Sequence, residues 1–161
     1  MAVVDMLRQA DVFHGLTDEE LTSLAQISRT AEFSTGDVIF EGGSASDELY
    51  LIENGEVDIQ VDPEEQSANS GSRPITITTL RRGQSFGEMA LVSEGIRAAT
   101  ARCAQHDTIL IVIPRDALLA LFDQQPRLGY KMMYNLAADL AMKIRATDVM
   151  IQERVTWSEI R

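Results

Sequence analysis

Between residues 31 and 113 the chain consists of short segments rich in β-branched and aromatic residues, separated by glycine-containing turns. The segments read AEFSTGDVIF, ELYLIENGEVDIQV, ITITTL and TARCAQHDTILIVI. Many short strands at this spacing favour an antiparallel β-roll, barrel or sandwich over a parallel sheet. The pair Asn54-Gly55, between ELYLIE and EVDIQV, predicts a hairpin. The polar stretch 62–74, DPEEQSANSGSRP, predicts an exposed hairpin tip.

Helical patterns flank this β-rich region on both sides. Before it, Thr17 is a good helix N-cap and Glu20 stands at the matching capping-box position. After it, Pro114 leads into a short helix, RDALLALFDQQ, and Pro126 begins a longer one. We therefore expect an α+β fold in one domain of residues 1–161, with N-terminal helices in 1–30, a jelly-roll-like antiparallel β-roll in 31–113 and C-terminal helices in 114–161.

The long C-terminal helix carries an apolar stripe at steps of 3 or 4 residues, interrupted by one Thr. A helix of this length with such a seam is expected to pack on something beyond its own small domain. We favour a coiled-coil-like contact that forms a homodimer, and packing along the β-roll is the alternative. The residues of the stripe are Met133, Leu136, Leu140, Ile144, Thr147, Ile151 and Val155.

Charge and composition argue against several classes of protein. The net charge is −11, from 14 Lys and Arg against 25 Asp and Glu, so the surface repels phosphate backbones and direct DNA binding is not expected. The longest apolar run, 109–113, is too short to cross a bilayer, and the N-terminus lacks the basic start of a secretory signal. Cys103 reads as a small buried residue of a strand, and His14 and His106 read as surface residues without metal-ligand spacing. We expect a cytoplasmic protein without a metal site.

The stretch FGEMALVSEGIRAAT, residues 86–100, places Glu88 and Arg97 among unusually small residues. Gly87 permits backbone angles that other residues avoid, and residues 88–92 can form one short helical turn with free N–H groups at its start. Such a turn is a ready anion site, and Arg97 supplies the fork geometry that a phosphate prefers. Glu88, an acceptor when ionised, suits a pair of sugar hydroxyls. The stretch therefore fits a ligand that carries both a phosphate and a ribose.

Residues 86–91, Phe-Gly-Glu-Met-Ala-Leu, and 97–100, Arg-Ala-Ala-Thr, resemble the phosphate-binding cassette of the cyclic nucleotide-binding domain family, which includes catabolite activators and kinase A regulatory subunits. The segments GDVIFEGG and DELYLIENGEVDIQV resemble the family's early β-roll strands, and the long helix resembles its C-terminal helix. This resemblance covers nearly the whole chain and implies a stand-alone member of the bacterial type. One departure is Ile96, where many members have Pro.

The resemblance also implies a role for each residue of the cassette. Glu88 would bind the ribose 2′-hydroxyl, Arg97 would bind the cyclic phosphate, and backbone N–H groups around Ala90 and Ala98 would complete the phosphate cradle. In this family a hydroxyl residue directly after the Arg tends to favour guanine, so Ala98 favours cAMP over cGMP as the ligand. The expected ligand-binding residues are Gly87, Glu88, Met89, Ala90, Arg97, Ala98, Ala99 and Thr147.

Thr147 belongs to this set because its hydroxyl is a candidate contact to the nucleotide base. The segment IRATD, residues 144–148, resembles the region where bacterial members present a hydroxyl to adenine. Because Thr147 lies in the apolar stripe, a buried hydroxyl there would need a partner, and the N6 group of the ligand could be that partner. The alternative is a hydrogen bond from the hydroxyl to the preceding turn of its own helix.

Together these features favour a cAMP sensor that relays ligand occupancy through its C-terminal helix to an effector protein or a further domain. The alternative is a scaffold for dimerisation or docking whose cassette no longer binds nucleotide. A phosphodiesterase or another enzyme is not expected, because the sequence offers no metal-ligand cluster and no set of nucleophile, base and orienting residue. The two helices predicted after Ile113 leave no segment for a DNA recognition helix.

Overall fold

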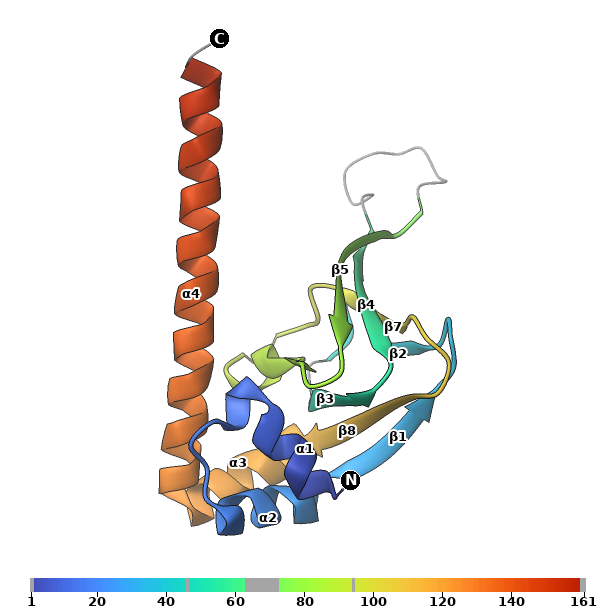
Figure 1. Cartoon of the computed structure of the whole chain (residues 1–161), viewed down its shortest axis with the longest axis vertical. Coiled ribbons are helices and arrows are strands. Elements are labelled where there is room, and N and C mark those ends of the chain that lie inside the picture. Colours follow the sequence, from blue (N-terminus) through green and yellow to red (C-terminus); the bar gives the residue numbers. More distant parts are fainter. Residues whose placement is uncertain (1, 46, 63–72, 94, 160–161) are drawn as a thin grey trace.

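A computed structural model describes residues 2–45, 47–62, 73–93 and 95–159 of the chain. Two antiparallel sheets of four strands each form a β-roll, and helices from both ends of the chain pack together beside it (Figure 1). The predicted α+β fold, with N-terminal helices, a β-roll and a long C-terminal helix, is confirmed. The first strand starts at Arg29 rather than at residue 31.

The helices and strands follow one another along the chain in the predicted order of helices, strands and helices. The helical elements are α1 (Val3–Gln9), η1 (Asp11–Phe13), α2 (Asp18–Ile27), η2 (Glu88–Leu91), α3 (Arg115–Gln124) and α4 (Pro126–Glu159). The strands are β1 (Arg29–Phe33), β2 (Val38–Phe40), β3 (Glu48–Asn54), β4 (Glu56–Val61), β5 (Ile75–Arg81), β6 (Ser85–Phe86), β7 (Thr100–Cys103) and β8 (Thr108–Pro114).

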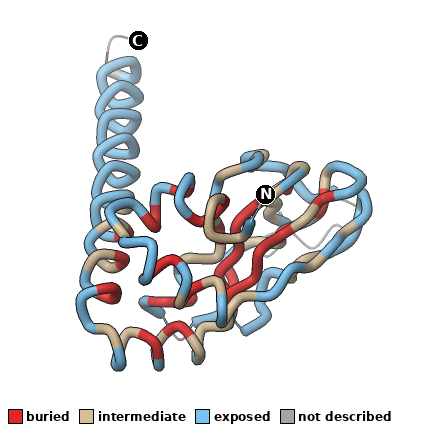
Figure 2. Tube along the Cα trace, turned by 60° about the horizontal axis from the view of Figure 1, so that its bottom comes forward, coloured by how far each residue is buried: buried red, intermediate tan, exposed pale blue. Residues whose placement is uncertain are grey.

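The two sheets have the strand orders β1-β8-β3-β6 and β2-β7-β4-β5. Strand β3 is buried on both faces, because Leu49 and Leu51 pack against the helices while Tyr50 and Ile52 pack against the other sheet. Figure 2 shows the buried residues gathered along the central strands and the inner faces of the helices. The molecule thus has one apolar core between helices and sheet and another between the two sheets.

The hairpin predicted at Asn54-Gly55 is wrong. Strands β3 and β4, which flank this pair, belong to different sheets, so the turn carries the chain from one sheet to the other. Gly55 has a φ of +91°, and a Cβ there would collide with Oγ1 of Thr108. The side chain of Asn54 donates a hydrogen bond to the backbone oxygen of Asp107 at 2.9 Å. Contacts with the start of β8, and not pairing across the turn, therefore fix this corner.

The cysteine, the two histidines and the polar stretch 62–74 were also assigned positions from the sequence. Cys103 is buried in β7, and His14 and His106 are exposed, as predicted. The predicted hairpin tip at 62–74 falls mostly on residues 63–72, which lie outside the described residues, although β4 and β5 on either side do pair antiparallel.

Across the described ranges, no group of three His, Cys, Asp or Glu residues could hold a metal ion. No helix in the described part of the chain is both long and apolar enough to span a membrane.

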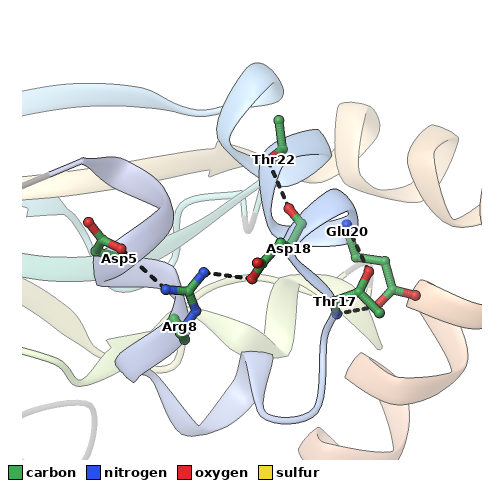
Figure 3. A network of polar contacts seen from close by, with 6 residues as sticks. All are labelled: Asp5, Arg8, Thr17, Asp18, Glu20 and Thr22. Atoms are coloured by element: carbon green, nitrogen blue, oxygen red, sulfur yellow. Dashed lines mark hydrogen bonds and ion pairs between the residues drawn. The ribbon is translucent and has the colours of Figure 1, made fainter.

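Helix α2 begins with the predicted capping box (Figure 3). The hydroxyl of Thr17 accepts from the backbone N–H of Glu20 at 3.2 Å, and the Glu20 carboxylate accepts from the backbone N–H of Thr17 at 2.8 Å. The same carboxylate accepts from Nζ of Lys131 on α4 at 2.8 Å. This one side chain therefore caps α2 and fastens it to the C-terminal helix.

Helix α4 is packed at its beginning and exposed over the rest of its length (Figures 1 and 2). Leu128, Met132 and Leu136 are buried in the core with α1, α2 and α3. Farther along the stripe, Ile144, Ile151 and Val155 are at least half exposed. Packing along the β-roll, the alternative interpretation of the stripe, is therefore wrong for residues 144–155.

Candidate functional site

Gly87 connects strand β6 to the short helix η2 and has a left-handed backbone, with a φ of +79°. A Cβ at this position would lie 2.8 Å from Nη1 of Arg97 and 2.9 Å from the backbone oxygen of Glu48. Both the backbone angle and the close approach exclude larger residues. Glycine is thus needed here to let the Arg97 side chain pass beside the main chain.

The guanidinium of Arg97 is buried and only partly hydrogen-bonded. Arg97 is 6% exposed, and its Nη2 donates to the backbone oxygen of Glu48 at 2.9 Å. The guanidinium carbon lies 4.0 Å from the ring centre of Phe40 and 5.6 Å from that of Tyr50. Its Nε has no hydrogen-bond partner within the described residues, and none of them forms an ion pair with it. A buried cation in this state is suited to an anionic ligand, because an unpaired buried charge is costly.

The turn between β2 and β3 holds the backbone of Arg97. Its N–H donates to the oxygen of Ser44 at 2.8 Å, and its oxygen accepts from the N–H of Gly43 at 2.7 Å. Ala45 and Ile96 form an isolated antiparallel bridge beside these bonds. This turn, through Gly43 and Ser44, therefore supports the candidate anion-binding residue.

A pocket of about 340 Å³ opens in front of Arg97. Its walls come from both sheets, from the cassette and from helix α4. Apolar side chains such as Phe40 and Leu80 form one part of the lining, and Glu88 and Lys143 add charge to another. The predicted residues that line this pocket are Gly87, Glu88, Met89, Arg97, Ala98 and Ala99.

Glu88 is paired with a residue of α4 and not with Arg97. Nζ of Lys143 lies 3.5 Å from Oε1 of Glu88 and 2.8 Å from Oδ2 of Asp139. The hydrogen bond to Asp139 is the main cause that raises the pKa of Lys143, and the charge of Glu88 adds to it against the effect of burial. Lys143 therefore stays positively charged beside the Glu88 carboxylate.

A second group of polar residues fixes the ring beneath Arg97. The hydroxyl of Tyr50 donates to Oε2 of Glu48 at 2.7 Å, and Nη2 of Arg29 donates to Oε1 at 2.8 Å. Burial opposes ionisation of Glu48, but the hydrogen bonds from Tyr50 and Arg29 outweigh it and lower the pKa of this carboxyl. Burial and the bond to Glu48 raise the pKa of Tyr50. Tyr50 therefore remains a neutral donor, with its ring stacked 4.9 Å from that of Phe86.

Two of the predicted residues do not line the pocket. Ala90 is fully buried, and its N–H donates to the oxygen of Gly87 at 3.1 Å, inside the turn. Thr147 is exposed, and its hydroxyl donates to the backbone oxygen of Lys143 at 2.9 Å. The bond within its own helix is the alternative predicted for Thr147, and a ligand role for its hydroxyl stays a prediction.

Residues 30–125, more than half of the chain, match the cyclic nucleotide-binding domain in sequence. This chain belongs to the cyclic nucleotide-binding domain family. It is 32% identical over 143 residues to the cyclic AMP receptor protein of Thermus thermophilus, covering 89% of this chain and 61% of the receptor. It is 27% identical over 112 residues to human cGMP-dependent protein kinase 2, covering 70% of this chain and 14% of the kinase.

The fold comparison agrees with the sequence match. The crystal structure of the Thermus thermophilus catabolite activator protein superposes with a TM-score of 0.73 at 31% identity, over 89% of this chain and 62% of that one. This member of the family thus spans less than two thirds of the length of each of these relatives.

Sequence reasoning missed several residues of the site in this family member. Phe40 and Tyr50 face the guanidinium of Arg97 from β2 and β3, and Lys143 reaches Glu88 from α4. Aromatic residues in strands are ordinarily core residues, so nothing in the sequence indicated that Phe40 and Tyr50 belong to the site. Lys143 carried a weak signal, because it precedes Thr147 by one helical turn and therefore lies on the same face.

Proposed function

We propose that this chain is a cAMP sensor that binds the nucleotide in the pocket in front of Arg97 and passes ligand occupancy to helix α4. The observation that supports it best is the buried Arg97 guanidinium, which lines a pocket and has an unpartnered Nε within the described residues. A phosphate placed there would supply the missing countercharge and accept from the guanidinium fork.

The other lining residues fit the rest of a cyclic nucleotide. Glu88 can accept from the ribose 2′-hydroxyl if the nucleotide displaces Lys143, whose contact to Glu88 is already long at 3.5 Å. Gly87, Ala98 and Ala99 line the pocket with little or no side chain, so the phosphate can approach the main chain. The pocket lining also includes Ile59 and Leu80, apolar residues against which a base can pack.

The preference for cAMP over cGMP rests on Ala98. A hydroxyl residue at this position tends to favour guanine in the family, and Ala98 has none. The relatives include proteins named for each nucleotide, the cyclic AMP receptor protein of Thermus thermophilus and human cGMP-dependent protein kinase 2. Replacing Ala98 with Thr is therefore expected to raise the affinity for cGMP relative to that for cAMP, measured by titration with both nucleotides.

Calorimetric titration of the wild type and of Arg97→Ala tests the proposal. The wild type is expected to bind cAMP more tightly than cGMP, and Arg97→Ala is expected to lose about 3 kcal/mol or more of binding free energy. Arg102→Ala is the matched control, since Arg102 also donates to a backbone oxygen, that of Gly36 at 2.8 Å, but does not line this pocket. Absence of heat and of thermal stabilisation with either nucleotide would favour the non-binding scaffold instead.

Helix α4 is the part of the molecule that would pass ligand occupancy on. The exposed stripe of α4 suits a homodimer through this helix, and an effector protein or a further domain would respond to it in the cytoplasm. The net charge of −11 continues to argue against direct DNA binding by these residues. Sedimentation of the wild type and of Ile151→Glu tests the dimer, because a charge in a dimer seam should shift the protein toward the monomer. An unchanged sedimentation coefficient in the variant would rule this seam out.

A further inference from the structure

One side chain connects the start of helix α3 to the cassette turn. Nε of Arg115 donates to the backbone oxygen of Ala90 at 2.6 Å, and Ala90 is fully buried in η2. Arg115 is the first residue of α3, and its side chain is 21% exposed. Carbonyl groups at the end of a short helix lack partners within that helix. The guanidinium of Arg115 thus satisfies a buried carbonyl of the turn that carries Glu88.

The backbone of Arg115 is bonded to the strand that also holds Arg97. The N–H of Arg115 donates to the oxygen of Asp47 at 2.8 Å, and the oxygen of the next residue, Glu48, accepts from Nη2 of Arg97 at 2.9 Å. Two successive peptide oxygens at the start of β3 therefore bind the first residue of α3 and the candidate phosphate-binding residue. One hydrogen bond joins η2 to α3 directly, and the Arg97 side chain is connected to α3 through the adjacent residues Asp47 and Glu48.

Apolar packing reinforces this connection. Leu91, the residue after Ala90, is buried in the same cluster as Leu118 and Leu121 of α3. The cluster continues into the first part of α4 through Leu128 and Met132. Movement of the cassette turn would therefore displace groups that α3 and α4 contact directly.

We propose that Arg115 is a positioning residue that holds the turn 88–92 in place for the nucleotide and connects it to α3. The part of this inference that concerns the nucleotide rests on the proposed function, whereas the positioning of the turn does not. Arg115 touches the turn through its main chain, so its effect on ligand binding is exerted through Glu88 and the backbone beside it.

Amide hydrogen exchange of the ligand-free protein tests the positioning directly. The N–H groups of Ala90, Val92 and Ser93 are hydrogen-bonded within the turn, so their exchange reports its opening. In Arg115→Met we expect exchange at these amides to rise about 10-fold, the effect of losing one hydrogen bond to a charged group, while strand amides keep their wild-type rates. Arg102→Met, which removes a guanidinium bond from β7 to the backbone oxygen of Gly36 in the turn between β1 and β2, should leave them unchanged. Wild-type exchange at all three amides in Arg115→Met would overturn the inference.

Titration with cAMP then tests the consequence for binding. Arg115→Met is expected to bind about 10-fold more weakly, and Arg115→Lys, which keeps a charged donor, to recover part of the loss. If the wild type binds no nucleotide, the proposed function fails, yet the exchange measurement still decides on Arg115. If Arg115→Met does not fold, the Nε–H signal of Arg115 in the wild-type NMR spectrum decides instead. A signal protected from exchange with water supports the bond to Ala90, and an unprotected one overturns it.

Discussion

Nζ of Lys143 on helix α4 lies 3.5 Å from Oε1 of Glu88 in the cassette. Lys143 is the residue of helix α4 that lines the pocket. Its contact with Glu88 therefore joins the helix to the site that we propose for the ribose. A nucleotide whose ribose binds the Glu88 carboxylate would displace Lys143 and remove this contact between α4 and the cassette. For the helix then to change its position, the ligand must bind the protein with different affinity in the two positions of the helix.

Replacement of Lys143 with Met should weaken this coupling with little effect on stability. The side chain is 61% exposed, so the free energy of unfolding should change by less than about 1 kcal/mol. In the wild type, saturation with cAMP is expected to alter amide exchange in α4, and in Lys143→Met this response should shrink. Arg154→Met, farther along the same helix, should keep the wild-type response. Equal responses in both variants would contradict a role for Lys143.

The parts of the fold that depend on neighbouring residues could be predicted from the sequence. The capping box of Thr17 and Glu20 involves one turn of helix, and the left-handed Gly87 follows from the motif around it. The pair Asn54-Gly55 was misleading because its sequence fits a hairpin, while the actual partners of β3 are β6 and β8, far along the chain. The sequence signal that was available is the run of four apolar residues 49–52, Leu-Tyr-Leu-Ile, because such a run predicts a strand that is covered on both faces.

The candidate site was likewise predictable from the sequence only where neighbouring residues define it. The cassette motif located Glu88, Arg97 and the small residues that line the pocket with them. The contacts of Arg97 with Phe40 and of Glu88 with Lys143 join residues that are far apart in sequence, and the motif does not include those partners. Such contacts depend on how the sheets and α4 pack, which local sequence does not determine.

Replacement of Gly87 with Ala should damage both stability and binding. A Cβ would meet Nη1 of Arg97 at 2.8 Å at a φ of +79°, so the guanidinium must move. We expect the free energy of unfolding to fall by about 2 kcal/mol or more, and the affinity for cAMP to fall as well. Gly36→Ala is the matched control, because Gly36 has a φ of +91° and a Cβ added there would meet no atom within 4 Å. It should cost about 1 kcal/mol and leave binding intact, as urea unfolding and titration will show.

Replacement of Thr147 with Ala tests the predicted contact to the base. Thr147 and Thr156 are both exposed on α4, and each hydroxyl donates to the backbone oxygen of the residue four positions earlier, at 2.9 Å. Because the two bonds are alike, Thr147→Ala and Thr156→Ala should change stability by the same small amount, less than about 0.5 kcal/mol. A ligand role predicts that cAMP affinity falls in Thr147→Ala alone. Identical affinities in the two variants would leave Thr147 with only its bond to Lys143.

Replacement of Glu20 with Gln should remove a stabilising contact whose strength depends on pH. Burial raises the pKa of Glu20, but hydrogen bonds from Lys131 and from the N–H of Thr17 outweigh it and hold the pKa below 4.5. A lowered pKa stabilises the fold above that pH, and the contribution disappears as pH falls through the folded-state value. Because Gln can still cap α2, Glu20→Gln should cost about 1–3 kcal/mol at neutral pH, the value of a charged hydrogen bond, and less when the pH is lowered to about 3, below the usual pKa of a Glu carboxyl. Urea unfolding at both pH values, with exposed Glu19→Gln as control, checks this; a constant difference between Glu20→Gln and wild type would contradict it.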